Sequence, residues 1–133
     1  MFAQVLFIVY TLFRLVNHLC FAQLQQPEEI IQIKDWYCGN DAITTAISYM
    51  VSGICPRHRL NRCCMAHDHC YERWRYSLTA LYQCDDHFAY CIYAAYCAEN
   101  PFCANWLFET HVKPIQLFGD DYKRNMDEFI KHT

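Results

Sequence analysis

From residue 41 onward, apolar positions recur at the spacing of an α-helix. They are separated by the polar Thr44, Thr45 and Ser48. The apolar positions are Ile43, Ile47, Met50 and Val51. Asn40 or Asp41 suits the N-cap of this helix, and Gly53 with Pro56 ends it. The pattern therefore predicts a short amphipathic helix between residues 41 and 53.

Two longer helical segments follow after a loop that is expected to run to about Leu60. The first covers residues 61 to about 77, and the second, rich in Ala and Tyr, covers residues 79 to 97. Asn100 and Pro101 end the second segment. Residues 106 to 118 are apolar but interrupted by Pro114, and the charged segment from Gly119 predicts a last short helix. Together these segments predict an all-α fold.

The first 22 residues contain no acidic residue and a single basic one, Arg14, around an apolar run. This composition is typical of a secretory signal peptide, and we expect cleavage after Ala22. A retained signal anchor is the alternative, but the apolar run is shorter than the ~20 residues that span a bilayer. Residues 23 to 35 are polar and rich in Gln, which predicts a flexible lead-in to one domain covering residues 23 to 133.

The composition excludes some classes of protein. Of 133 residues, 54% are hydrophobic and 19% charged, as in a folded chain. Without Arg14, ten Lys and Arg stand against fourteen Asp and Glu. A mildly acidic chain is a poor partner for nucleic acid, which is bound through clustered positive charge. Its net charge does not favour anionic membranes either.

Nine of the ten cysteines lie after Ala22. This density in a small exported chain predicts a disulfide framework and a secreted, extracellular protein. They are Cys38, Cys55, Cys63, Cys64, Cys70, Cys84, Cys91, Cys97 and Cys103.

The spacing of four cysteines favours a pair of stapled helices. Cys63 and Cys70 are seven residues apart, as are Cys84 and Cys91, so each pair lies on one helix face about 10.5 Å apart. In antiparallel helices, bridges 63 to 91 and 70 to 84 form together, each with Cα atoms ~5.5 to 6 Å apart. Six cysteines allow 15 pairings, so spacing favours this pairing without proving it.

The remaining cysteines leave alternatives open. Cys64 points about 100° away from the ladder, and Cys38 is the nearest partner that would tie down the lead-in. Cys55, Cys97 and Cys103 are an odd number. One of them is a free thiol, pairs between chains, or pairs with Cys20 if cleavage occurs elsewhere.

His67 shares the helix face of the ladder and therefore looks toward the next helix. In the antiparallel register it lies near His87 and about half a turn from Asp85. The Asp85 carboxylate can then accept a hydrogen bond from one ring nitrogen and leave the other as a base. Tyr71, one turn on, can donate to the same carboxylate. The alternative for His67 is a buried structural histidine.

Asp68 is rotated about 100° from His67 around the helix, toward the face that carries Cys64. If Cys38 pairs with Cys64, the segment around Cys38 lies beside Asp68. A bidentate Asp with loop carbonyls is a sensible part of the shell of six to eight oxygens that calcium prefers. The alternative for Asp68 is a helix-face carboxylate that binds no metal.

Three segments resemble the secreted phospholipase A2 family. Asn61-Arg62-Cys63-Cys64-Met65-Ala66-His67-Asp68-His69-Cys70-Tyr71 resembles its active-site helix, whose signature is Cys-Cys-x-x-His-Asp-x-Cys-Tyr. Cys84-Asp85, with Cys91 seven residues on, resembles its second long helix, and Trp36-Tyr37-Cys38-Gly39 resembles the start of its calcium loop. The resemblance covers roughly residues 36 to 91.

The resemblance implies an all-α, disulfide-rich fold with two long antiparallel disulfide-linked helices. It implies bridges Cys38-Cys64, Cys63-Cys91 and Cys70-Cys84. The implied activity is calcium-dependent hydrolysis of the sn-2 ester of glycerophospholipids at a membrane surface. His67 would be the base and Asp85 would orient it, with Tyr71 in support. Calcium (Ca2+) would bind Asp68 and the backbone carbonyls of Tyr37, Gly39 and Asp41.

The calcium loop departs from the family pattern. The family continues Cys-Gly-x-Gly-Gly, whereas this chain reads Cys38-Gly39-Asn40-Asp41-Ala42, without the glycines that let the backbone turn its carbonyls onto the ion. A helix that starts at Asp41 disfavours a cation there, unless the Asp41 carboxylate itself is a ligand. This loop is similar to that of divergent invertebrate phospholipase A2-like proteins. The alternative function is a secreted binding protein of this type with impaired catalysis.

Other polar clusters have simpler interpretations. A zinc site is the alternative for a set of potential ligands, but thiols of an exported chain are expected to be oxidised. The set is Cys63, Cys64, His67, His69, Cys70, Cys84 and His87. Asp86, His69 and His87 are expected to be solvated or structural. Trp106, Leu107 and Phe108 form either a lipid-contacting patch or part of the core.

Overall fold

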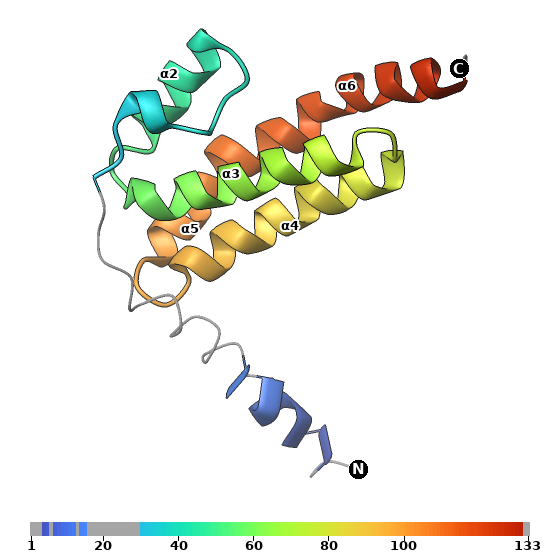
Figure 1. Cartoon of the computed structure of the whole chain (residues 1–133). Coiled ribbons are helices and arrows are strands. Elements are labelled where there is room, and N and C mark those ends of the chain that lie inside the picture. Colours follow the sequence, from blue (N-terminus) through green and yellow to red (C-terminus); the bar gives the residue numbers. More distant parts are fainter. Residues whose placement is uncertain (1–3, 6, 13, 16–29, 132–133) are drawn as a thin grey trace.

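The computed structural model describes residues 4–5, 7–12, 14–15 and 30–131. No strand occurs in the described part of the chain, and the all-α, disulfide-rich fold is confirmed. Figure 1 shows α3 and α4 lying antiparallel, with α6 running beside them and α2 set off at one end. The elements from residue 30 onward are η1 (Ile33–Asp35), α2 (Ala42–Val51), α3 (Arg57–Trp74), α4 (Leu78–Tyr96), α5 (Pro101–Leu107), η2 (Phe108–Val112) and α6 (Lys113–Lys131).

The short helix α2 begins at the predicted cap. The Asp41 side chain accepts hydrogen bonds from the amides of Ile43 and Thr44, and the Thr44 side chain accepts one from the Asp41 amide. This reciprocal capping box satisfies amides that have no partner within the helix. Gly39, just before it, has a φ of +110°, a conformation that favours glycine.

Helix α3 begins at Arg57, so the predicted loop to Leu60 is wrong. The cause lies in a tertiary contact. The Tyr96 hydroxyl of α4 accepts a hydrogen bond from the Leu60 amide and donates one to the Pro56 carbonyl. It therefore supports the first turn of α3 from another helix, and this support is invisible in the local pattern. Desolvation of the buried hydroxyl raises the pKa of Tyr96 above its ordinary range.

Two disulfides link α3 to α4 in the predicted antiparallel register. Cys63 pairs with Cys91 and Cys70 with Cys84, with Cα atoms 5.7 and 5.8 Å apart. Equal seven-residue spacing on both helices gives both bridges the same span. The ladder fixes the rotation of each helix about its axis.

The lead-in is tied to α3, as predicted, by the Cys38-Cys64 bridge. Asn61 reinforces it, since its side-chain oxygen accepts from the Tyr37 amide and its side-chain nitrogen donates to the Asp35 carbonyl. This segment is thereby held against the start of α3.

A fourth bridge between described residues joins Cys55 to Cys103, a pairing that the spacing left open. Cys97 is disulfide-bonded as well. No cysteine within the described residues is free. The free-thiol alternative is therefore wrong for this part of the chain.

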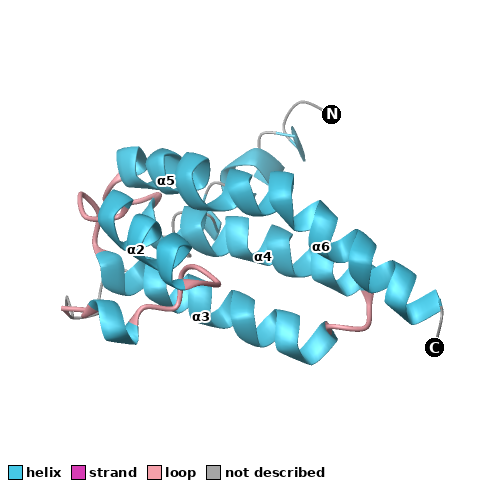
Figure 2. Ribbon diagram, turned by 90° about the horizontal axis from the view of Figure 1, so that it is seen from above, coloured by secondary structure: helices cyan, strands magenta, loops and turns pink. Residues whose placement is uncertain are grey.

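Residues 101–131 form one continuous helical run, contrary to the expected interruption at Pro114. Helix α5 leads through the π-helical turn η2 into α6, which runs from Lys113 through Gly119 to Lys131. Figure 2 shows α5 and α6 covering α4. A proline in a helix clashes with the carbonyl four residues earlier, which here is that of Thr110. Thr110 lies in the wider π turn of Phe108–Val112, and this turn relieves such crowding.

The core forms where α3, α4, α5 and η2 meet. Its fully buried side chains include Leu60, Ile92, Tyr96, Leu107 and Val112. In the described residues, no helix is long and apolar enough to cross a membrane. The expected cleavage after Ala22 falls outside the described residues.

Candidate active site

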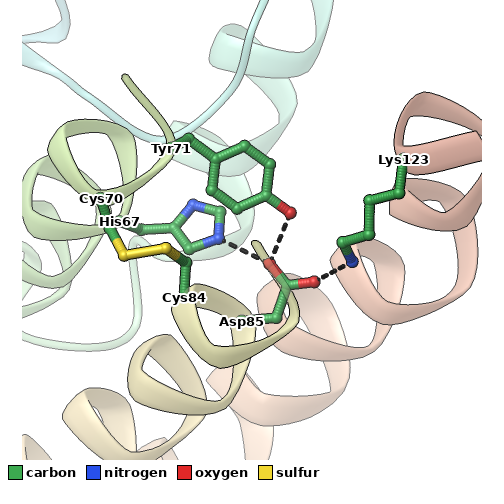
Figure 3. A network of polar contacts seen from close by, with 6 residues as sticks. All are labelled: His67, Cys70, Tyr71, Cys84, Asp85 and Lys123. Carbon is green, nitrogen blue, oxygen red and sulfur yellow. Dashed lines mark hydrogen bonds and ion pairs between the residues drawn. A yellow bond between two sulfur atoms is a disulfide. The ribbon is translucent and has the colours of Figure 1, made fainter. Parts of the chain in front are cut away.

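His67 lies on the face of α3 that turns toward α4. Its Nε2 atom lies 2.9 Å from Oδ1 of Asp85, the contact that the register predicts (Figure 3). An ionised carboxylate only accepts hydrogen bonds, so Nε2 carries the ring proton and Nδ1 keeps its lone pair. No described residue hydrogen-bonds Nδ1. The geometry therefore leaves one ring nitrogen available as a base.

The Asp85 carboxylate is the centre of the site. Tyr71 donates its hydroxyl to Oδ1 at 2.7 Å, as predicted, and Lys123 of α6 pairs with Oδ2. The side chain of Asp85 is 4% exposed and that of His67 is 11% exposed. Burial by itself raises the pKa of the Asp85 carboxyl, but hydrogen bonds from His67, Lys123 and Tyr71 and the Lys123 charge outweigh it. The pKa of Asp85 is therefore below its ordinary value, and the group is ionised.

Lys123 was not predicted from the sequence. It lies in a charged segment with Asp120, Asp121 and Arg124, where a lysine is expected to be exposed. Its side chain is instead 1% exposed. Only the packing of α6 on α4 distinguishes this lysine from its charged neighbours.

A small cavity of about 150 Å³ lies between α3 and α4 beside the site. It is lined by His67, His87, Phe88 and the two bridges of the ladder. The rings of His67 and Phe88 are 4.9 Å apart, so an apolar group borders the base. A larger open hollow of about 590 Å³ beside Tyr49 and Arg57 contains none of the predicted site residues.

The predicted calcium ligands differ in how many of their oxygens are already hydrogen-bonded. The Asp41 carbonyl accepts the first hydrogen bond of α2 from Thr45, at 2.9 Å. Its carboxylate accepts hydrogen bonds from the amides of Ile43 and Thr44, both at 2.9 Å. The carbonyl oxygen and Oδ1 of Asp41 are therefore committed to the helix start, which also presents a partial positive charge. Oδ2 has no hydrogen bond within the described residues, so Asp41 as a calcium ligand rests on this oxygen and stays a prediction.

The other three predicted calcium ligands also keep available oxygens. Asp68 is exposed on α3, and its carboxylate has no hydrogen bond or ion pair within the described residues. Partial desolvation raises the pKa of Asp68. Tyr37 is held by its amide, which leaves its carbonyl available, and Gly39 takes its left-handed turn nearby in the chain. Calcium prefers six to eight oxygens, so these three would form a sparse shell.

The zinc alternative is wrong. Cys63, Cys64, Cys70 and Cys84 are all in disulfides, and an oxidised cysteine is no thiolate ligand. No group of three or more His, Cys, Asp or Glu residues suited to a metal occurs among the described residues.

The remaining residues considered from the sequence are either exposed or part of the core. His69, Asp86 and His87 are exposed, as expected of solvated residues. Leu107 belongs to the core and Phe108 packs against it, half-buried, whereas Trp106 is exposed and its indole nitrogen donates to the Val51 carbonyl at 2.8 Å.

Comparison with known proteins gives one informative match. Over 66 residues the chain is 35% identical to a phospholipase A2-like protein of Caenorhabditis elegans. The match covers 47% of this chain but only 36% of the relative's length. No protein-family model and no solved structure matches. The similarity supports a relationship between this chain and phospholipase A2-like proteins.

Proposed function

We propose that the chain is a secreted phospholipase A2 that hydrolyses the sn-2 ester of glycerophospholipids, with His67 as its general base. The observation that carries this proposal is the contact of His67 Nε2 with Asp85 Oδ1 at 2.9 Å, which leaves Nδ1 unprotonated. The similarity to a phospholipase A2-like protein supports the substrate class. The disulfides support export to an oxidising compartment.

The proposed chemistry is proton transfer at one ring nitrogen. Nδ1 of His67 takes a proton from water, and the hydroxide attacks the ester carbonyl carbon. The protonated ring then returns the proton to the departing glycerol oxygen as the acyl–oxygen bond breaks. The products are a free fatty acid and a lysophospholipid. Asp85 stabilises the charged ring between these two transfers.

One exposed, uncharged face of the protein, on α2, suits contact with the membrane surface that would supply the substrate. Residues 42 to 56 contain no charged side chain. On α2, Ile43 and Met50 are 73% and 74% exposed, and Ile47 lies between them on the same face. An uncharged apolar helix face suits a zwitterionic phospholipid surface better than an anionic one.

Calcium enters the proposal mainly through Asp68, Tyr37 and Gly39, because the carbonyl oxygen and Oδ1 of Asp41 cap α2. The same capping favours a second candidate function, a secreted phospholipase A2-like protein that binds lipid surfaces without hydrolysing them. The two candidates share the fold and the disulfide ladder. They differ in whether the protein hydrolyses phospholipid.

The test is release of fatty acid from phosphatidylcholine vesicles by the oxidised chain, measured with calcium and with a chelator. We expect His67→Gln to lower turnover by at least about 100-fold, the scale of a lost general base. His69→Gln is the matched control, because His69 is exposed on the same helix. Equal turnover in His67→Gln and the unchanged chain would overturn the proposal. Vesicle binding without hydrolysis would establish the second candidate.

A further inference from the structure

The side chain of Lys123 is enclosed at the centre of the site. It is 1% exposed, although lysine is almost never fully buried unless it is paired. Its Nζ atom pairs with Oδ2 of Asp85 and lies 4.3 Å from the ring centre of Tyr82, both on α4. A cation in this position meets one carboxylate and one aromatic face.

The two oxygens of Asp85 have different partners (Figure 3). Oδ1 accepts from His67 and Tyr71 of α3, whereas Oδ2 contacts Lys123 of α6. A carboxylate with all its donors on one oxygen can rotate, and a buried carboxylate without a cation is costly to ionise. The ion pair with Lys123 opposes both rotation and protonation.

Gly119, one turn before Lys123, brings the backbone of α6 close to the ion pair. A Cβ atom at this position would lie 3.4 Å from Nζ of Lys123 and 3.9 Å from both Oδ2 of Asp85 and the hydroxyl of Tyr71. The glycine therefore lies directly over the ion pair. Position 119 leaves little room there for a side chain larger than that of alanine.

We propose that Lys123 is a positioning residue that keeps the Asp85 carboxylate ionised and turned so that Oδ1 faces Nε2 of His67. The consequence for catalysis rests on the proposed phospholipase function, but the consequence for Asp85 does not. Among the described side chains, the charged and titratable groups that face Asp85 are His67 and Tyr71 from α3, and Lys123 from α6.

The first test follows the Asp85 side-chain carbon by carbon-13 nuclear magnetic resonance as pH is lowered. In Lys123→Gln, which keeps a hydrogen-bond donor but no charge, we expect the protonation midpoint of Asp85 to rise by at least one pH unit. Arg124→Gln is the control, since Arg124 is exposed on the same helix and pairs with Asp121 instead. An unchanged Asp85 midpoint in Lys123→Gln would overturn the proposal.

The second test is a double-mutant cycle on turnover. We expect Lys123→Gln to lower kcat about tenfold or more, with little change in KM, and to have no further effect when Asp85 is already Asn. A purely structural lysine would lower activity equally in both backgrounds, and that result would overturn the positioning role. If the unchanged chain hydrolyses no phospholipid, the proposed function fails, and the Asp85 titration still decides the role of Lys123.

If Lys123→Gln does not fold, a measurement on the unchanged chain still tests the contact between Lys123 and Asp85. The Nζ resonance of Lys123 should shift at the pH at which Asp85 is protonated, because the two groups are in contact. A Lys123 resonance that does not respond to that protonation would contradict the proposal.

Discussion

Asp41 and Thr44 hydrogen-bond each other's backbone amides. Oδ1 of Asp41 accepts from the Thr44 amide at 2.9 Å, and Oγ1 of Thr44 accepts from the Asp41 amide at 3.2 Å. The resemblance to the phospholipase A2 calcium loop implies a calcium-binding carbonyl at Asp41. Here that carbonyl instead accepts the first hydrogen bond of α2 from the Thr45 amide.

The capping role of Asp41 can be separated from a calcium role by substitution. Asparagine caps a helix as well as aspartate does, whereas alanine does not. We therefore expect Asp41→Ala to lower the melting temperature at pH 7 and Asp41→Asn to leave it nearly unchanged. Any rise in melting temperature that calcium causes should be equal in Asp41→Asn and the unchanged chain. A calcium effect that disappears in Asp41→Asn would instead identify Asp41 as a ligand.

The pH dependence of this cap has a defined sign. Hydrogen bonds from the Thr44 amide, the Ile43 amide and the Thr44 side chain outweigh desolvation and lower the pKa of Asp41 from 3.8. Its stabilising effect is therefore present above pH 3.8 and is lost as pH falls through the lower folded-state value. Asp41→Asn should lack this loss.

Gly39 is predicted to be the least replaceable glycine. A Cβ atom there would lie 2.5 Å from the Thr45 amide nitrogen and 2.6 Å from its Cα, and φ is +110°. Because backbone cannot move aside as a flexible side chain can, Gly39→Ala should lower the free energy of unfolding by at least about 2 kcal/mol. Urea unfolding measures this change.

Gly53→Ala is the control for Gly39→Ala. Gly53 has no positive φ, and a Cβ there would meet the end of the Arg57 side chain at 2.8 Å, which can shift. A loss of stability as large in Gly53→Ala as in Gly39→Ala would contradict the argument from backbone conformation.

The contact between His67 and Asp85 was predictable because every step toward it is local. Helical period places His67 on the face of Cys63 and Cys70, and the equal spacing of Cys84 and Cys91 sets the register of the opposite helix. Two bridges then bring Asp85 to within about half a turn of His67. Each step needs only spacing within one helix and the geometry of a disulfide.

The contacts that the sequence did not predict all depend on distant segments. Lys123 is 38 residues from Asp85. Because Pro114 lies between them, the sequence predicted a separate last helix away from the site. Tyr96 supports the start of α3 from a position 40 residues beyond Pro56. Neither contact can be read from the spacing of apolar residues in one helix, because both are determined by how separate helices pack.

Because His111 is buried, we expect the free energy of unfolding to fall in mild acid. Burial lowers the pKa of His111 to about 4 from its ordinary value of 6.5. The unfolded chain therefore takes up a proton below pH 6.5 that the folded chain refuses until about pH 4. Stability should fall as pH is lowered through this range, by about 3 kcal/mol at most.

Urea unfolding at pH 7 and pH 4.5 measures the effect of His111. His111→Asn keeps a polar group near Oγ1 of Thr110, which lies 2.8 Å from Nδ1, but does not titrate. We expect the difference in unfolding free energy between the two pH values to shrink in this variant. An identical difference in both proteins would assign the acid sensitivity to other groups.

The exposed apolar face of α2 predicts how the protein meets a lipid surface. Replacing Ile43 and Met50 by serine removes two side chains that are exposed on this face. Because each apolar side chain buried in lipid stabilises binding by roughly 1.5–3 kcal/mol, the double variant should bind phosphatidylcholine vesicles at least about tenfold more weakly. Its melting temperature should stay close to that of the unchanged chain, since neither side chain lies in the core. Vesicle co-sedimentation measures the binding.

Leu117 and Phe118 provide a matched control for this face. Both are exposed to a similar degree, at 70% and 73%, but lie on α6. Replacing them by serine removes comparable apolar area without touching α2, so vesicle binding should be little changed. Equal weakening by the two double variants would mean that general surface hydrophobicity, and not the α2 face, sets membrane affinity. In that case the uncharged stretch from residue 42 to residue 56 would lose its proposed role.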